Sequence, residues 1–269
     1  MTNRLELNWK LDGFVDEQRY YCSDTPMDVN NLPAPKAIFA GSTRMYTDTD
    51  IVANQQYFIR VSAVKNGTEK VGEQIILDAK DYSKYTAYFR LIDFFDKNGG
   101  ESLTAAGNAK IDNLAAYFDG AGDWLQRADA SATTFGTNDL TVECEFKCER
   151  IGTHTSDQVL VDNFVNGSGG WQIALKSTGK VFLYLNTPNI EAIVSANSYS
   201  DGNWHKVKWT RSGSTNTLSV DGVSVGTYTD KRNFTQKTRI GVGAQIGSRN
   251  ASYDFKGWIR RLGFAKQVL

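Results

Sequence analysis

Closely spaced carboxylates in the segment AYFDGAGDWLQ are the first residues of the chain that could do chemistry. Asp119 and Asp123 lie in a glycine-rich stretch with aromatic residues on both sides. Hard cations such as calcium take several oxygen ligands from carboxylates and backbone carbonyls. Asp119 and Asp123, with Asp254 from a later polar loop, are therefore the candidate calcium ligands. A tight corner between two strands, allowed by the glycines, is the alternative interpretation.

A second pair of acids, Glu143 and Glu145, lies in TVECEFKCE. Glycoside hydrolysis needs two carboxylates that face one substrate. In jelly-roll hydrolases these acids follow the pattern E-x-D-x-E, but here Lys147 takes the third place. A solvated strand face explains the pair better, and the chain has two histidines and no G-x-S-x-G motif. The sequence predicts a protein that is not an enzyme, with a glycan-cleaving enzyme as an alternative.

The elements that carry these residues are predicted to be short β-strands. Apolar and polar residues alternate in segments such as QRYYC, YFIRVSAV, TVECEF, KVFLYL and WHKVKWT, and Gly, Asn, Asp and Ser separate them. Asp221-Gly222 in SVDGVSV predicts a hairpin with a type I′ turn. The segment at 101–118 is the one stretch that could hold a helix. The predicted fold class is all-β, with two β-sandwiches in tandem.

Composition excludes several classes of protein. Thirty basic and thirty acidic residues give a formal net charge of zero, which argues against nucleic acid as a partner. No apolar run is long enough to insert into a membrane, and the first residues predict no secretory signal peptide. Cys144 and Cys148 lie four strand steps apart, about 13 Å, which is too far for a disulfide. Free thiols suit assembly in a reducing cytoplasm.

A domain boundary is expected near residue 80. Residues 1–80 resemble a fibronectin type III domain, because Y-x-x-R-V-x-A-V is followed by a turn at Asn66-Gly67 and an apolar strand. The residues that carry this resemblance are Trp9, Tyr57, Arg60, Val61, Ala63, Ile75, Ile76 and Leu77. Such domains are mostly spacers and docking modules, so the resemblance implies docking to other proteins of an assembly.

Residues 81–269 resemble the laminin-G-like, concanavalin A-like jelly roll, and more loosely the pentraxins. The motifs occur in the family's order as FDGAGDWL, DLTVE, DGNWH, LSVDGVSVG and FKGWIRRL. The resemblance implies a lectin-like fold in which Phe118 and Leu125 point into the sandwich. It also implies structural roles for Trp204, His205 and Asp221.

The resemblance to pentraxins implies a ligand site between two loops, Val161–Trp171 and Gly243–Phe255. The acidic cluster of that family is largely missing from the second loop, where Gln245, Ile246 and Gly247 stand. A third loop could add a rim through Asn186 and Tyr199. Ordinary hairpin connections are the alternative interpretation. The candidate ligand-binding residues are Asp162, Asn163, Asn166, Gln245, Ser248, Arg249, Asn250 and Tyr253.

These observations favour binding of a glycan or another host-surface ligand. A leaderless chain with free cysteines and extracellular-type modules is typical of a bacteriophage tail or capsid-surface protein, which folds in the host cytoplasm and leaves by lysis. The small domain would then dock to other virion proteins. The alternatives are a structural virion subunit that binds no sugar and a fragment of a bacterial cell-surface adhesin. An oligomer is compatible with the sequence, although no coiled-coil heptads are present.

Overall fold

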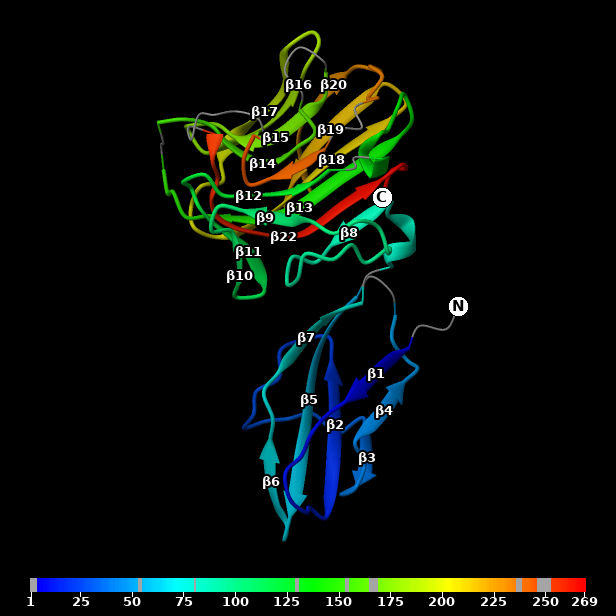
Figure 1. Ribbon diagram of the computed structural model, residues 1–269. Helices are drawn as coiled ribbons and strands as arrows, with labels where there is room; N and C mark the ends of the chain where they lie inside the picture. Colours follow the sequence, from blue (N-terminus) through cyan, green and yellow to red (C-terminus); the bar gives the residue numbers. More distant parts are fainter. Residues whose placement is uncertain are drawn as a thin grey trace. The chain divides into compact units, whose positions relative to one another are not determined.

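The protein is an all-β chain, as the alternating patterns predict. A computed structural model describes residues 4–52, 55–79, 81–128, 131–152, 155–164, 169–235, 239–245 and 253–269. Its helical turns in these ranges are short 3₁₀ turns, among them η1 (Tyr82–Lys84) and η2 (Ser131–Thr133). Within the same ranges, no helix is long and apolar enough to cross a membrane. The chain divides into two compact units, Met1–Asp81 and Tyr82–Leu269 (Figure 1).

The smaller unit has two sheets around an aromatic core. Strands β1 and β4 form one sheet, and β3-β2-β5-β6 form the other, with β7 also paired to β5. Tyr20, Tyr57 and Ile59 are buried between them. The Lys36 ammonium and the Tyr20 hydroxyl both contact the buried Asp48 carboxylate. The strands are β1 (Leu5–Asn8), β2 (Glu17–Ser23), β3 (Ala37–Ala40), β4 (Met45–Asp48), β5 (Gln56–Lys65), β6 (Thr68–Val71) and β7 (Ile75–Asp78).

The larger unit contains two sheets that share one core. One sheet has the order β10-β11-β22-β13-β18-β19-β20, with β8 paired to β22, and the other has the order β17-β16-β15-β14-β21-β12-β9. The strands are β8 (Ala87–Phe89), β9 (Thr104–Ala106), β10 (Lys110–Asp112), β11 (Ala115–Asp119), β12 (Trp124–Arg127), β13 (Leu140–Cys148), β14 (Gln158–Asp162), β15 (Trp171–Leu175), β16 (Lys180–Leu185), β17 (Ile190–Ser198), β18 (Trp204–Ser212), β19 (Thr215–Val220), β20 (Val223–Thr229), β21 (Ile240–Val242) and β22 (Lys256–Ala265).

Strand alternation decides which side chains enter this core. On β15, Trp171, Ile173 and Leu175 pack inward, so Gln172 and Ala174 lie on the outer face of the sheet. Trp171 meets Trp209 of the opposite sheet edge-on, with ring centroids 5.3 Å apart. Phe118 and Leu125 are fully buried in the same core, which confirms their expected orientation.

The cysteines behave as the strand spacing predicts. Cys144 and Cys148 lie on one strand, β13, and both are buried free thiols. Burial raises the pKa of both groups. They therefore act as small core side chains.

Turn chemistry accounts for two segments of the larger unit. Asp221 and Gly222 have φ values of 52° and 79°, which confirms the type I′ hairpin between β19 and β20. The segment at 101–118, the one stretch that could have held a helix, forms β9, β10 and β11. Asn113 and Leu114 both have positive φ and close the β10–β11 hairpin. The turn residues interrupt any helical repeat, and pairing with β12 and β22 provides partners for the strands.

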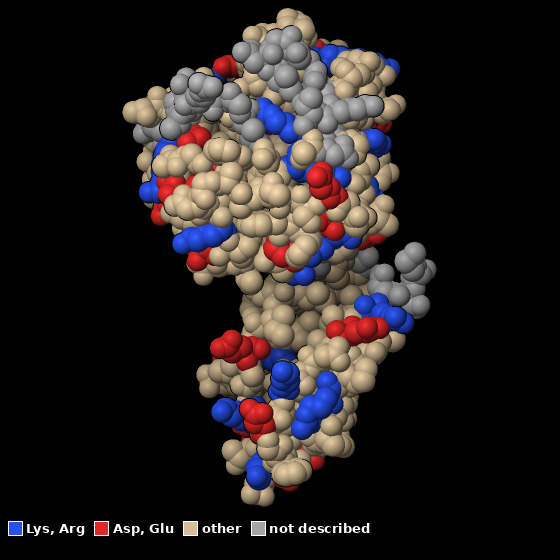
Figure 2. Space-filling view, in the orientation of Figure 1, with Lys and Arg blue, Asp and Glu red and all other residues tan. Residues whose placement is uncertain are grey.

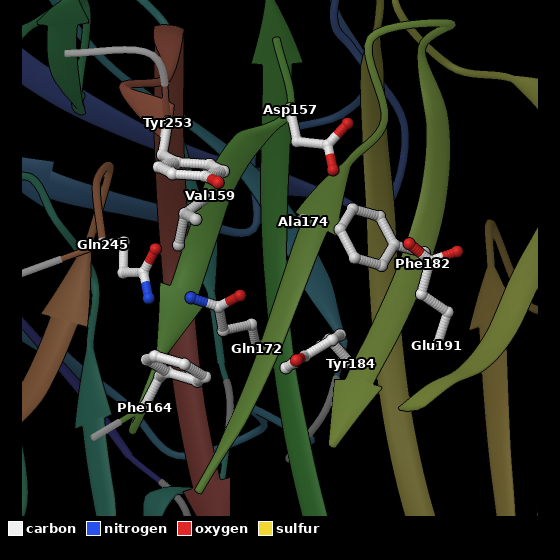
Figure 3. A pocket seen from close by; sticks show the side chains of 10 residues that line it. All are labelled: Asp157, Val159, Phe164, Gln172, Ala174, Phe182, Tyr184, Glu191, Gln245 and Tyr253. Atoms are coloured by element: carbon white, nitrogen blue, oxygen red, sulfur yellow. The ribbon is translucent and has the colours of Figure 1, made fainter. Parts of the chain in front are cut away.

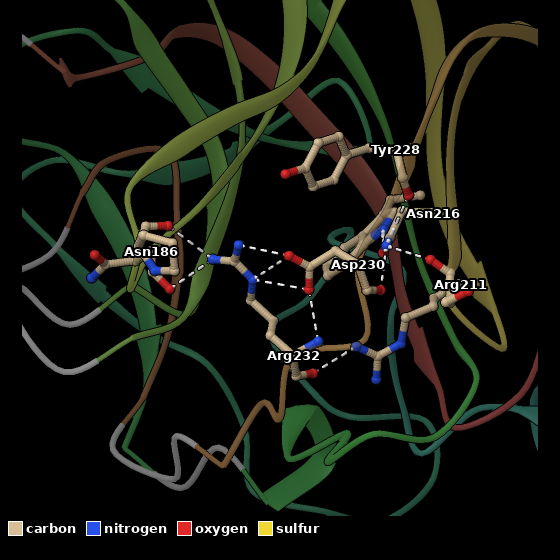
Figure 4. A network of polar contacts seen from close by, with 9 residues as sticks. Asn186, Arg211, Asn216, Tyr228, Asp230 and Arg232 are labelled. Carbon is tan, nitrogen blue, oxygen red and sulfur yellow. Dashed lines mark hydrogen bonds and ion pairs between the residues drawn. The ribbon is translucent and has the colours of Figure 1, made fainter.

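A buried arginine holds the loops at one end of the larger unit. Arg211 is fully buried, and its guanidinium donates to the carbonyl oxygens of Gly136, Asn138 and Arg232. The Arg232 guanidinium forms an ion pair with Asp230 (2.7 Å) and donates to the carbonyl oxygens of the loop at 186–188 (Figure 4). We call Arg211, Asn216, Asp230 and Arg232 the Arg211 cluster.

Candidate binding site

The carboxylates of the FDGAGD segment fix a turn. Both Asp123 oxygens accept backbone N–H groups, from Asn108 (2.7 Å) and Asp119 (2.8 Å). Asp119 accepts from Ala121 N and from the Asn108 amide. Asp254 reaches the same turn and accepts from Gly122 N at 2.7 Å. The three carboxylates that the sequence predicted as calcium ligands are thus brought to one corner of the fold.

The hydrogen bonds of these three carboxylates show that they stabilise the turn. The hydrogen bond from Asn108 lowers the pKa of Asp119, whereas burial raises the pKa of Asp254. Among the described residues, no group of three or more His, Cys, Asp or Glu side chains is arranged to hold a metal ion. A calcium ion would have to share oxygens that already accept N–H bonds. The observed bonds support a tight corner, and calcium binding stays an untested prediction.

A pocket of about 250 Å³ lies on the outer face of the β14–β17 part of the second sheet. Figure 3 shows the Gln172 amide near its centre, with aromatic rings on several sides. The pocket is lined by Asp157, Val159, Phe164, Gln172, Ala174, Phe182, Tyr184, Glu191, Gln245 and Tyr253.

Period-two alternation places these residues on one face. Gln172 and Ala174 on β15 and Phe182 and Tyr184 on β16 alternate with side chains of the core. Val159, Ala174 and Phe182 form a small apolar cluster of their own. Phe164 adds a second aromatic wall, with its ring centroid 6.0 Å from that of Tyr184. The pocket therefore combines an apolar base with aromatic sides.

The charged groups at the pocket form one cluster. The Lys176 ammonium contacts the Glu191 carboxylate and lies 3.6 Å from Asp157 Oδ2. The same ammonium lies 4.3 Å from the centroid of the Phe182 ring. Asp157 Oδ1 also accepts a hydrogen bond from Ser177 N. The lining thus carries two carboxylates, and both are close to the ammonium of Lys176, which lies next to the lining.

A buried polar group lies beneath the pocket at the end of β14. Asp162 is opposite Gln172 in the strand register, so the two side chains share the outer face. Asp162 is fully buried, and its Oδ1 lies 3.5 Å from Nη1 of Arg239. The Arg239 guanidinium also donates to the carbonyl oxygen of Phe164 at 2.7 Å, and the backbone carbonyl oxygen of Arg239 accepts from the Asn163 amide. We call Asp162, Asn163, Gln172 and Arg239 the Asp162 cluster.

The Asp162 cluster contains unsatisfied polar atoms. Within the described part of the chain, Asp162 Oδ2, Asn163 Oδ1 and Gln172 Nε2 are buried without a hydrogen-bond partner. Burial raises the pKa of Asp162 to about 7, although Arg239 and, less strongly, the Phe164 N–H and the nearby Gln172 amide favour the charged carboxylate. Buried polar groups are usually paired, so these atoms can pair with a water, an ion or a ligand polar group that reaches the cluster.

Some predicted ligand-binding residues meet at this site. Gln245 and Tyr253 line the pocket, and Asp162 and Asn163 lie in the adjoining cluster. Asn166, Ser248, Arg249 and Asn250 lie outside the described residues. The two rim residues separate: the Asn186 amide donates to Gly169 O, whereas the Tyr199 ring contacts His205.

Sequence reasoning missed the residues that come from strands. Gln172, Phe182 and Tyr184 face outward in WQIAL and KVFLYL, segments interpreted only as core strands. The sequence did contain a signal for these residues, because aromatic residues or amides at the outward-facing positions of adjacent strands lie on one shared surface. The pairing of those strands with their neighbours brings Asp157, Phe164 and Glu191 to the same pocket.

The acids considered for hydrolysis lie on the other sheet and are partnered. Glu143 is buried and accepts from the Tyr85 hydroxyl at 2.6 Å and from the Lys206 ammonium at 3.1 Å. Glu145 forms ion pairs with Arg260 and Arg261. Both side chains serve to hold strands β13, β18 and β22 together.

Solved structures with similar folds include sugar-binding and sugar-cleaving proteins. Domain 4 of AbnA, a GH43 extracellular arabinanase from Geobacillus stearothermophilus in complex with arabinotriose, has a TM-score of 0.56 and 17% identity, covering 69% of this chain and 94% of that one. A Trypanosoma rangeli sialidase in complex with 2,3-difluorosialic acid has a TM-score of 0.56 and 10% identity, covering 81% of this chain and 42% of that one.

The binding domain of Botulinum Neurotoxin DC, in complex with SialylT, has a TM-score of 0.53 and 13% identity, covering 69% of this chain and 48% of that one. The chain therefore spans less than half of the sialidase and neurotoxin chains that it matches. At these identities the similarity establishes the fold alone. Among curated proteins, no sequence matches this chain.

A family model gives the assignment of the larger unit. The model Laminin_G_3, described as the concanavalin A-like lectin/glucanases superfamily, matches residues 119–269, which is more than half of the chain. The match covers most of the segment whose motifs resemble that family and includes every strand that lines the pocket. The chain belongs to the concanavalin A-like lectin/glucanases superfamily.

Proposed function

We propose that the chain is a non-enzymatic carbohydrate-binding protein and that the pocket on the outer face of β14–β17 is its glycan site. The observation that carries the proposal is the combination of four aromatic side chains with two amides around one pocket. The aromatics are Phe164, Phe182, Tyr184 and Tyr253, and the amides are Gln172 and Gln245. Ligand sites of this kind are mostly apolar, with a few placed polar groups that fix orientation.

The chemistry of a sugar fits this lining. The C–H face of a sugar ring is apolar and can pack on the rings of Phe164 and Tyr184. Its hydroxyls can accept from amide nitrogens and donate to the carboxylates of Asp157 and Glu191. The similar folds of an arabinanase domain in complex with arabinotriose and a neurotoxin domain in complex with SialylT support this class of ligand.

Hydrolysis of a glycan is the second candidate, because Asp157 and Glu191 lie at the pocket and share one ammonium. Catalysis needs one carboxyl as an acid and the other as a nucleophile or base. Lys176 contacts Glu191 and lies 3.6 Å from Asp157 Oδ2, so both carboxylates are engaged with one cation, which favours binding over catalysis. Reducing-end assays on every glycan that binds test this choice, and turnover abolished by Glu191→Gln would favour the enzyme.

The setting that we propose is a bacteriophage tail or capsid surface, with the fibronectin-III-like smaller unit docking to other virion proteins. Free thiols, a net charge of zero and two sandwich units support it. On the face that Figure 2 shows, basic and acidic side chains are interspersed over both units, as suits a protein without a nucleic-acid partner. Co-sedimentation with virions and binding to host cells distinguish this setting from a purely structural subunit or an adhesin fragment.

A glycan array tests the proposed site directly. The intact chain, Tyr184→Ala and Tyr117→Ala are compared, with calcium and again with chelator. Tyr117 is a half-buried tyrosine on the other sheet and serves as the matched control. We expect Tyr184→Ala to lose binding and the control to keep it. Loss in chelator would add a metal to the site, and equal binding by all three proteins would place the site elsewhere.

A further inference from the structure

We infer that the pocket selects uncharged sugars and rejects sugars that carry a carboxylate. This inference rests on the proposed function and names its ligand class. It follows from the charges that line the pocket, from the partners of its cation and from the faces of its aromatic rings.

The lining has a surplus of negative charge. Asp157 and Glu191 contribute two carboxylates, and within the described part of the chain Lys176 contributes the ammonium in contact with them. Among the described residues that line the pocket, none is a lysine or an arginine. A ligand carboxylate would therefore enter beside two like charges, which is unfavourable at these distances even in a partly solvated site.

The nearby cations are already engaged. The Lys176 ammonium contacts Glu191, lies near Asp157 and packs over the Phe182 ring. Arg239 forms its ion pair with the buried Asp162 and donates to the carbonyl oxygen of Phe164. Recruiting Lys176 for a ligand would take it from the two pocket carboxylates, and recruiting Arg239 would take it from Asp162 and from the carbonyl oxygen of Phe164.

The remaining groups suit neutral oxygen atoms. Gln172 is 8% exposed, its Nε2 has no partner within the described chain, and in Figure 3 this nitrogen points toward Gln245. An amide N–H can donate to a hydroxyl or ring oxygen without supplying a positive charge. The faces of the Phe164 and Tyr184 rings carry partial negative charge, so they favour C–H groups over carboxylates. Sugar hydroxyls, in turn, can donate to Asp157 and Glu191.

Paired glycans with and without a carboxylate provide the test. The intact protein is titrated with lactose and 3′-sialyllactose, and with galactotriose and trigalacturonate, on an array and then by calorimetry. Glu191→Gln removes one pocket charge, and Glu73→Gln makes the same change at an exposed position of the smaller unit. We expect a neutral member to bind at least tenfold more tightly than its acidic partner, with the ratio falling below about threefold in Glu191→Gln only.

The outcomes separate the two proposals. Equal or tighter binding of the acidic members by the intact protein would overturn the charge selection while leaving a glycan-binding protein. A preference for neutral glycans that Glu191→Gln leaves unchanged would also overturn the charge mechanism. No binding to any glycan, with Tyr184→Ala indistinguishable from the intact protein, would overturn the proposed function and this inference with it.

Discussion

The larger unit contains two buried polar clusters that contrast in how fully their hydrogen bonds are made. In the Arg211 cluster, the guanidinium of Arg211 donates to three backbone carbonyls, and the Asn216 amide bonds Trp209 and Tyr228. In the Asp162 cluster, atoms of Asp162, Asn163 and Gln172 are buried without partners inside the described chain. Both clusters lie in one sandwich, so burial alone does not explain the difference.

The contrast separates structural from binding roles. The guanidinium nitrogens of Arg211 all donate to backbone carbonyls, so they hold the loops in place and are not free to bind another molecule. A buried amide with an unused N–H next to a pocket loses nothing when a ligand arrives, and gains a partner. We therefore expect changes in the Arg211 cluster to alter folding, and changes in the Asp162 cluster to alter binding and its response to pH.

Replacing Arg211 should have the largest effect on stability. Arg211→Met removes the donor to the carbonyls of Gly136, Asn138 and Arg232 and frees the loops that it holds. We expect the unfolding free energy of the larger unit to fall by about 3–5 kcal/mol in urea denaturation followed by tryptophan fluorescence. The matched change Arg4→Met, at an exposed position, should fall within about 0.5 kcal/mol of the parent. A loss below about 1 kcal/mol for Arg211→Met would remove this contrast.

Protonation of Asp162 should give the next effect. Its pKa is about 7 in the folded chain, against an ordinary value of 3.8. Because folding raises the pKa of this carboxyl, the folded state is favoured when the group is protonated, and stability is lost as the pH rises through 7. Between pH 6 and pH 8 we expect a loss of about 1.4 kcal/mol.

Asp162→Asn keeps the shape of the side chain and removes its titration. The variant should show a flatter dependence of the unfolding free energy on pH over this range. Parallel curves for the parent and the variant would mean that the ion pair with Arg239 keeps Asp162 charged throughout, and the Asp162 cluster would then resemble the Arg211 cluster.

The contrast also shows what the sequence could and could not predict. Alternation within strands such as WQIAL and KVFLYL is local, so the all-β fold, the core positions of Phe118 and Leu125 and the Asp221-Gly222 turn were predictable. The strands of the segment at 101–118 were not predictable, because short strands with turn residues between them acquire their partners only in the folded sheets.

The pocket was only half predictable for the same reason. Gln245 and Tyr253 were found because they lie in polar loops, which attract attention in a sequence. Gln172 and Tyr184 were missed because a residue on the outer face of a strand becomes part of a site only once the register of four strands is fixed. The pairing of Asp162 with Arg239 joins positions far apart in the chain, and no spacing rule reports it.

Replacing Gln172 tests whether the Asp162 cluster contributes to ligand binding. Gln172→Leu retains most of the side-chain volume and removes the N–H that has no partner. We expect affinity for a bound neutral glycan to fall by roughly five- to tenfold, because one neutral hydrogen bond is worth about 1 kcal/mol, with little change in melting temperature. Asn216→Leu should do the reverse, lowering the melting temperature and leaving affinity unchanged. If Gln172→Leu unfolds the protein instead, the amide is a structural group.

The smallest effect is expected at His205, where a fully partnered cluster lies near the surface. His205 Nδ1 lies 2.7 Å from Asp221 Oδ2, and Nε2 lies 3.0 Å from Asp201 Oδ1. Burial alone would lower the pKa of His205, but these hydrogen bonds outweigh it and raise that pKa. The stabilisation is therefore present below pH 6.5 and is lost as the pH rises through the raised value.

The His205 cluster tests whether a polar group with complete hydrogen bonding, but with partly exposed partners, contributes strongly to the free energy of unfolding. Because both carboxylates are about half exposed, we expect His205→Gln to change the unfolding free energy at pH 5.5 by less than about 1 kcal/mol. Measuring it in the Asp162→Asn background removes the other titration in this range. A loss as large as that of Arg211→Met would show that pairing outweighs burial, whereas a small loss indicates that a polar group stabilises this sandwich strongly only when it is both paired and buried.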